Sequence, residues 1–142
     1  MSVIGYTTGV YDLFHVGHLN LLRRARAMCD YLVVGVTTDE LCLLRKNKTP
    51  VIPLEERIAI ISELRCVDKV VPQADMDKYG AWERHRFHRM FVGDDWKGHP
   101  KWVELEQRFA LNGVEIVYFP YTAHISTTYL RSSIATAAAT NA

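Results

Sequence analysis

The sequence lacks a long apolar run, a basic leader segment and an excess of charge of either sign. None of its apolar stretches is long enough to cross a bilayer, and residues 1–3 lead directly into an apolar segment. We therefore expect a cytoplasmic protein with no membrane contact. The 17 Lys and Arg residues nearly balance the 16 Asp and Glu residues, which gives a net charge of +1. Nucleic-acid binding needs a concentrated basic excess, so no nucleic-acid partner is expected.

Cysteine is also scarce. Cys29, Cys42 and Cys66 form no Cys-x-x-Cys pair. An odd number without paired spacing favours reduced, mostly buried thiols over disulfides or zinc ligands, so we expect no protein-held metal. Apolar residues, in contrast, make up 49% of the 142 residues. That content predicts a single domain over residues 1–142, in which the small-residue tail 135–142 frays.

Short apolar segments alternate with amphipathic helical patterns along the chain. Strands are predicted at residues 3–7, 31–36, 67–71, 90–93 and 115–119, and helices around residues 21–29, 54–64, 79–87, 100–111 and 127–138. This alternation predicts an α/β fold, with a single Rossmann-like, doubly wound parallel five-stranded sheet and helices on both faces. Such sheets bind ligands beyond the carboxyl ends of their strands.

Two histidines lie at the junction between the first predicted strand and the first predicted helix. His15 and His18 are three residues apart, with Gly17 between them. A histidine pair at this spacing is often structural, but packing alone does not require two imidazoles and a glycine at such a corner. A helix start offers free N–H groups and a positive dipole end, and imidazoles add further donors. The pair therefore predicts a phosphate site.

Three other polar clusters also follow predicted strands. Residues 45–50 read as a flexible basic loop, either a solvated surface loop or a phosphate clamp. Residues 93–98 place Trp96 between a carboxylate pair and a lysine, which offers a flat apolar wall. Residues 122–128 supply three hydroxyls at a helix start, either a simple N-cap or a second anion site.

Together these residues resemble a known family. The segment 9–18 is similar to the His-x-Gly-His signature of nucleotidyltransferases, and segments 93–96 and 125–128 are similar to its cytidylyltransferase branch. The resemblance runs from about residue 3 to residue 134 with the motifs in matching order. It is greatest for glycerol-3-phosphate cytidylyltransferases.

The resemblance implies transfer of CMP from CTP to a small phosphorylated alcohol, with sn-glycerol 3-phosphate as the first candidate, and release of pyrophosphate. It also implies a homodimer and a Mg²⁺ ion bound through the triphosphate. The implied catalytic residues are His15, His18 and Lys46. These three would also contact the nucleotide, together with Gly9, Val10, Tyr11, Asp95, Tyr121, Thr122, His124, Ser126, Thr127 and Thr128. The implied acceptor-binding residues are Lys48, Arg57, Lys78 and Trp96, with Arg57 bracing the site.

The sequence departs from the family pattern at residues 121–124. The family usually has Arg-Thr-x-Gly there, whereas this chain has Tyr-Thr-Ala-His, so an arginine is absent and an imidazole replaces a glycine. The departure leaves alternatives open. The acceptor could be another polyol phosphate, a phosphocholine-like or phosphoethanolamine-like monoester, or a phosphonate. The chain could also be a nucleotide-binding regulatory module with weak turnover, although retention of both histidines and Lys46 favours an enzyme.

Two weaker features have structural interpretations. His85 and His88 could form half of a metal site, but a basic, solvated helix face is the favoured reading because no further ligand lies at a suitable spacing. Trp82 and Trp102 are interpreted as packing or dimer-contact residues.

Overall fold

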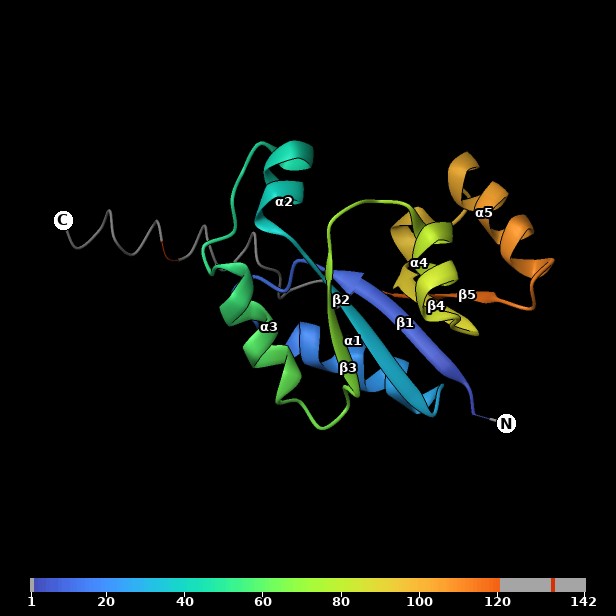
Figure 1. The fold of residues 1–142 in the computed structure, drawn as a ribbon, viewed down its shortest axis with the longest axis horizontal. Coiled ribbons are helices and arrows are strands. Elements are labelled where there is room, and N and C mark those ends of the chain that lie inside the picture. Colours follow the sequence, from blue (N-terminus) through green and yellow to red (C-terminus); the bar gives the residue numbers. More distant parts are fainter. Residues whose placement is uncertain (1, 121–133, 135–142) are drawn as a thin grey trace.

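The computed structural model describes residues 2–120 and 134, and its centre is a five-stranded sheet (Figure 1). All neighbouring strands pair in parallel. The strand order is β3-β2-β1-β4-β5, built from β1 (Ile4–Gly9), β2 (Tyr31–Thr37), β3 (Lys69–Gln73), β4 (Arg89–Gly93) and β5 (Glu115–Phe119). The order reverses between β1 and β4, which makes the carboxyl ends of these two strands the expected ligand site. The predicted fold class is confirmed.

Helices cover both faces of the sheet and bury a separate apolar cluster on each. One face packs against α1 (Val16–Ala27) and α3 (Leu54–Ser62), through Leu22, Ala25 and Ile61. The other packs against α4 (Lys78–His85) and α5 (Pro100–Ala110), through Ala81 and Phe109. β2 is nearly continuous in apolar residues because it is buried on both faces.

A short helix, α2 (Asp39–Lys46), lies at the carboxyl edge of the sheet, where the sequence predicted only a loop at residues 45–50. That prediction is wrong for the first two residues of the segment. Thr38 caps the helix by accepting a hydrogen bond from the Leu41 N–H, and Asn47 ends it in the left-handed conformation at a φ of 55°. The helix has only eight residues and buries two of them, too few for a clear helical period.

The edges of two other elements differ from the prediction. β3 begins at Lys69 and includes Pro72, which an edge strand tolerates because one side of its backbone has no partner strand. α4 ends at His85, and Arg86 takes a left-handed φ of 50°. His88 therefore lies beyond the helix, and the expected helix face carrying both histidines is wrong. The Nδ1 atom of His88 instead accepts the Ile4 N–H at 3.0 Å.

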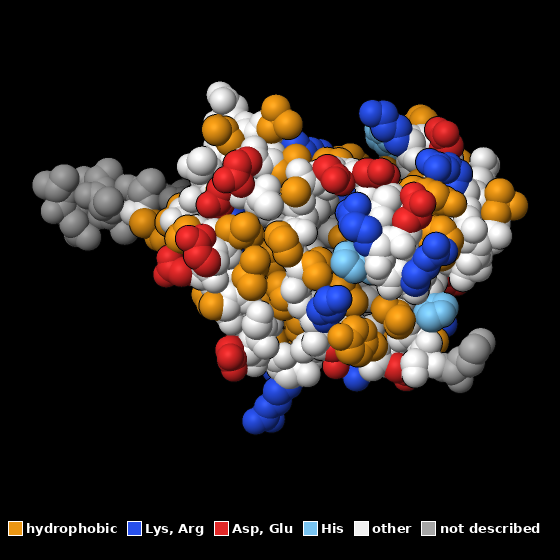
Figure 2. Space-filling model, viewed as in Figure 1, with side chains coloured by type: hydrophobic (Ala, Val, Ile, Leu, Met, Phe, Trp, Pro, Cys, Tyr) orange, Lys and Arg blue, Asp and Glu red, His pale blue; other side chains and the backbone are white. Residues whose placement is uncertain are grey.

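The surface in the view of Figure 2 mixes Lys and Arg side chains with Asp and Glu side chains. Among the described residues, no helix is both long and apolar enough to span a bilayer. Cys29 and Cys42 are buried and Cys66 is partly buried, and all three are free thiols.

Candidate functional site

A cleft of about 1270 Å³ opens at the carboxyl edge of the sheet. It brings together residues that lie far apart in the sequence. Many of the residues that the sequence singled out line it, namely Gly9, Val10, Tyr11, His15, His18, Lys46, Lys48, Lys78, Asp95 and Trp96. The cleft is therefore the candidate active site.

His15 and His18 form the N-terminal cap of α1. His15 is the N-cap residue, and its Nδ1 atom accepts the Gly17 N–H at 3.0 Å. The Nδ1 atom of His18 accepts the His15 N–H at 3.3 Å, so two imidazoles form a reciprocal capping box. The rings stack with their centroids 3.9 Å apart. The motif spacing thus has a local structural cause, because residues three apart at a helix start can cap each other.

This capping pattern fixes the protons of the two imidazoles. In each ring Nδ1 is the acceptor, so the proton of the neutral ring is on Nε2. Burial lowers the pKa of His15, and burial followed by the nearby His15 lowers the pKa of His18 to about 4. Both rings are therefore neutral near pH 7. The Nε2 atom of His15 is buried and has no hydrogen-bond partner within residues 2–120, which leaves its N–H for a ligand.

The chain between β1 and α1 is tightly constrained. Tyr11 and Leu13 have positive φ angles of 54° and 50°, which is uncommon outside glycine. The Tyr11 ring lies so close to Gly9 that a Cβ at position 9 would come within 2.9 Å of it. Gly9 therefore allows the approach of the aromatic ring, and the loop holds the histidines in one position.

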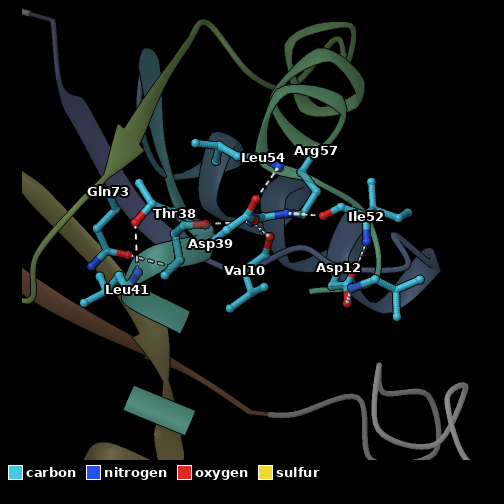
Figure 3. A network of polar contacts seen from close by, with 11 residues as sticks. Val10, Asp12, Thr38, Asp39, Leu41, Ile52, Leu54, Arg57 and Gln73 are labelled. Atoms are coloured by element: carbon cyan, nitrogen blue, oxygen red, sulfur yellow. Dashed lines mark hydrogen bonds and ion pairs between the residues drawn. The ribbon is translucent and has the colours of Figure 1, made fainter. Parts of the chain in front are cut away.

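Asp12 fastens this loop to the chain that follows α2 (Figure 3). Its side chain is buried, and its two carboxylate oxygens accept the N–H groups of Val51 at 2.8 Å and Ile52 at 2.9 Å. Lys46 ends α2, and Lys48 lies between α2 and these two residues. Both lysines are exposed at the cleft wall. The segment with the lysines is thus tied to the loop with the histidines.

Arg57 of α3 completes the same network (Figure 3). Its guanidinium donates to the carbonyls of Ile52, Val10 and Thr37 at 2.7–2.8 Å, and to the Asp39 carboxylate at 2.5 Å. Only 1% of the residue is exposed, and it does not line the cleft. This burial fits the predicted bracing role and corrects the expected contact with the acceptor, because four protein oxygens already occupy the guanidinium.

Lys78 reaches the cleft from the start of α4. Its Nζ atom donates to the Thr8 hydroxyl at 3.1 Å. Burial, and to a lesser extent Arg45, lowers the pKa of the ammonium group to about 8. Gln73 lies nearby at the end of β3, where its Oε1 atom accepts the Thr37 hydroxyl at 2.9 Å. Thr8, Thr37 and Gln73 were not predicted from the sequence, although their positions at or next to the ends of predicted strands were an available signal.

The segment after β4 forms one turn of 3₁₀ helix, Asp94–Trp96. Asp95 and Trp96 line the cleft, and the Trp96 side chain is 41% exposed. Trp102 lies 6.2 Å from Trp96 between ring centroids and packs partly against the core. Trp82 packs against the same core cluster, as expected of a packing residue.

Several predicted residues lie outside the described part of the chain: Tyr121, Thr122, His124, Ser126, Thr127 and Thr128, with the predicted tail 135–142. Their roles stay predictions. Within residues 2–120 and 134, no cluster of three or more His, Cys, Asp or Glu side chains could hold a metal ion. His85 stacks on Tyr6 at 5.7 Å, which gives this imidazole a packing role.

Comparison with known proteins identifies the family. The family model described as cytidylyltransferase-like matches residues 6–133. Glycerol-3-phosphate cytidylyltransferase of Bacillus subtilis is 37% identical over 136 residues, covering 91% of this chain and 95% of that enzyme. The chain is thus a nucleotidyltransferase by class. It belongs to the cytidylyltransferase-like family, which confirms the resemblance noted in the sequence.

The chain is also similar to a second cytidylyltransferase in sequence and to a solved structure in fold. The mouse ethanolamine-phosphate cytidylyltransferase is 52% identical over 66 residues, which cover 46% of this chain and 16% of that enzyme. The crystal structure of a lipopolysaccharide core biosynthesis protein from Thermoplasma volcanium aligns with a TM-score of 0.72 and 25% identity. That alignment covers 88% of this chain and all of the other. The parallel α/β architecture is therefore shared by solved structures.

Proposed function

We propose that this protein transfers CMP from CTP to sn-glycerol 3-phosphate, giving CDP-glycerol and pyrophosphate. One observation carries the proposal: paired neutral imidazoles share a cleft with Lys46, Lys48 and Lys78, and the Nε2 atom of His15 has no partner in the described part of the chain. The similarity to glycerol-3-phosphate cytidylyltransferases over nine-tenths of the chain supports the acceptor. The shorter match to ethanolamine-phosphate cytidylyltransferases makes phosphoethanolamine the competing acceptor to test.

The reaction needs no covalent enzyme intermediate. A phosphate oxygen of the acceptor attacks the α-phosphorus of CTP, the new P–O bond forms, and the bond to the pyrophosphate oxygen breaks. Because the acceptor phosphate is already ionised, no base has to remove a proton. Catalysis then depends on positioning and on stabilising the charge of the crowded phosphates.

The residues of the cleft have different roles in this reaction. The Nε2–H groups of His15 and His18 donate to the α-phosphoryl oxygens as negative charge builds there. Lys46 neutralises the departing pyrophosphate. Lys48 and Lys78 bind the acceptor phosphate. Arg57 contacts no substrate, and it acts by holding the loops that carry these groups.

We propose that Mg²⁺ reaches the cleft bound to the triphosphate of CTP. Mg²⁺ prefers oxygen ligands, keeps several waters and commonly binds through substrate phosphates with few protein ligands. The described cleft is lined by the carboxylates of Asp12, Asp77, Asp95 and Glu104, but the described residues form no cluster of three or more possible ligands, which fits an ion carried by the triphosphate. The ion would neutralise part of the phosphate charge, and the protein would bind the complex of CTP and magnesium.

We propose a homodimer, because large apolar side chains are exposed around α2 and α3, including Leu43, Leu44, Val51 and Ile60. Hydrophobic side chains gather on that side of the molecule in Figure 2. Sedimentation velocity over a range of concentrations tests this assembly. A cytoplasmic location stays a prediction, which fractionation of the producing cells tests.

A panel assay tests the proposed reaction. The protein is incubated with magnesium, one nucleoside triphosphate and one phosphomonoester at a time, and the pyrophosphate released is measured. We expect CTP to exceed ATP, GTP and UTP, glycerol 3-phosphate to exceed phosphoethanolamine, and a chelator to abolish release. A preference for phosphoethanolamine would reassign the acceptor. Tight CTP binding without pyrophosphate from any pair would support the regulatory alternative.

A further inference from the structure

The Lys78 ammonium lies in the cleft, and it forms no ion pair with a carboxylate in the described part of the chain. Among the ion pairs formed within residues 2–120, none involves Lys78. Its one hydrogen bond there is to the hydroxyl of Thr8, at 3.1 Å. An ammonium group has three N–H donors. Two of them have no partner among residues 2–120 and can donate to an anion in the cleft.

Thr8 is held in a defined position. It lies opposite Gly35 in the β1–β2 pairing. A Cβ on Gly35 would come within 3.0 Å of the Thr8 methyl group and 2.8 Å of the Tyr6 hydroxyl. Glycine at position 35 thus leaves room for the Thr8 methyl to pack against β2. With the methyl group so placed, the hydroxyl of Thr8 is the group that meets Lys78.

The charged groups around Lys78 lie on α2 and in the segment between β3 and α4. Arg45 of α2 lowers the pKa of the ammonium, Asp75 between β3 and α4 raises it, and burial lowers it most. Asp77 also lines the cleft, but its Oδ1 atom accepts the Gly80 N–H as the N-cap of α4. The hydroxyl of Thr8 accepts a hydrogen bond from the ammonium and so favours its charged form.

We propose that Thr8 is a positioning residue for the acceptor: its hydroxyl holds the Lys78 ammonium at the carboxyl end of β1, where the ammonium meets the acceptor phosphate. This inference rests on the proposed function. Thr8 contacts no substrate in this arrangement. Its effect passes through Lys78, on the face of the sheet that α4 covers. The histidines act from the start of α1, on the other face.

Kinetics of three variants test the proposal. Thr8→Val keeps the shape of the side chain and removes the hydroxyl, Thr8→Ser keeps the hydroxyl, and Thr7→Val is the matched control. Thr7 is the preceding residue of β1, and its hydroxyl donates to the Phe91 carbonyl at 2.9 Å. We expect Thr8→Val to raise the KM for glycerol 3-phosphate about fivefold, the equivalent of one hydrogen bond, without changing the KM for CTP. Thr8→Ser should restore the wild-type KM. Thr7→Val should lower the melting temperature and leave the acceptor KM unchanged.

A second measurement follows the protonation of the Lys78 ammonium itself and does not require catalytic activity. The pKa of Lys78 is followed by NMR of protein labelled with ¹³C at the lysine ε-carbons. We expect Thr8→Val to lower this pKa below its starting value of about 8, and Thr8→Ser to retain it. An unchanged acceptor KM or an unchanged Lys78 pKa in Thr8→Val would overturn the proposal, as would an equal rise in KM in Thr7→Val. Failure of the wild-type protein to release pyrophosphate would instead overturn the proposed function, and the NMR measurement would still test the contact.

Discussion

The imidazoles of His15 and His18 stack 3.9 Å apart, and each accepts a backbone N–H through Nδ1. One arrangement therefore serves two purposes. The Nδ1 atoms cap α1, and the Nε2–H group of His15, which has no partner among the described residues, remains for the phosphate chemistry proposed above. The cap requires an unprotonated Nδ1 in each ring, and the low pKa of His18 keeps its ring in that form near pH 7.

Substitution of His15 can separate these two purposes. Asn is a good N-cap residue but lacks the Nε2–H group, whereas Ala lacks both. We expect His15→Asn to lower kcat about a hundredfold or more with a melting temperature close to wild type. His15→Ala should lose turnover to the same extent and also about 1 kcal/mol of stability. Steady-state kinetics and thermal unfolding of both variants are the measurements. Near-normal turnover in His15→Asn would remove the imidazole from the chemistry.

The pH dependence of stability should reflect His18. Its pKa falls from about 6.5 in an unfolded chain to about 4 in the folded protein, so folding favours the neutral ring. The resulting stability is fully present above pH 6.5 and is lost as the pH falls toward 4. We expect the free energy of unfolding in urea to decrease over this range, and His18→Gln to flatten part of the decrease. An identical pH profile in the variant would show that His18 is not the group that titrates.

Arg57 should matter for the stability of the fold around the cleft. Arg57→Met leaves the Val10, Thr37 and Ile52 carbonyls without their donor and removes the partner of Asp39. We expect a loss of about 3 kcal/mol in the free energy of unfolding. Arg23→Met, at an exposed arginine of α1, is the matched control and should change little. Equal stability of the two variants would contradict the bracing role.

The two lysines around the end of α2 should have different kinetic effects. Lys46→Ala should lower kcat about a hundredfold, because it removes charge stabilisation from the transition state. Lys48→Ala should mainly raise the KM for glycerol 3-phosphate. Initial rates with each substrate varied in turn distinguish the two effects. If the variants behaved alike, the proposed division between nucleotide and acceptor would fail.

Much of the fold could be predicted from the sequence because its signals are local. The run at residues 31–36 and the helical periods of α1, α3 and α5 each fall within one element, and their alternation implies a parallel sheet. α2 was missed because eight residues with two buried side chains give no clear period. The end of α4 was misplaced because a left-handed Arg86, unlike a glycine, gives no stop signal.

The sequence points to a candidate site most clearly where one segment carries the residues. His15, Gly17 and His18 lie close together in the sequence and interact with one another, so the sequence could single them out together, although it did not predict that they cap the helix. The contact between Lys78 and Thr8 joins residues 70 apart in the chain, and the burial of Arg57 depends on four segments meeting. Contacts between residues so far apart in the chain produce no recognisable spacing in the sequence. The sequence could suggest a bracing role for Arg57 only through resemblance to a family.

The most direct test of cytidylyl transfer follows the α-phosphate itself. The wild-type protein and His15→Asn are incubated with magnesium, [α-³²P]CTP and glycerol 3-phosphate, and the labelled products are separated. We predict that the wild-type protein moves the label into CDP-glycerol in equal amount to the pyrophosphate released, and that His15→Asn does so about a hundredfold more slowly. Absence of labelled CDP-glycerol with the wild-type protein, or transfer by His15→Asn at the wild-type rate, would contradict this account.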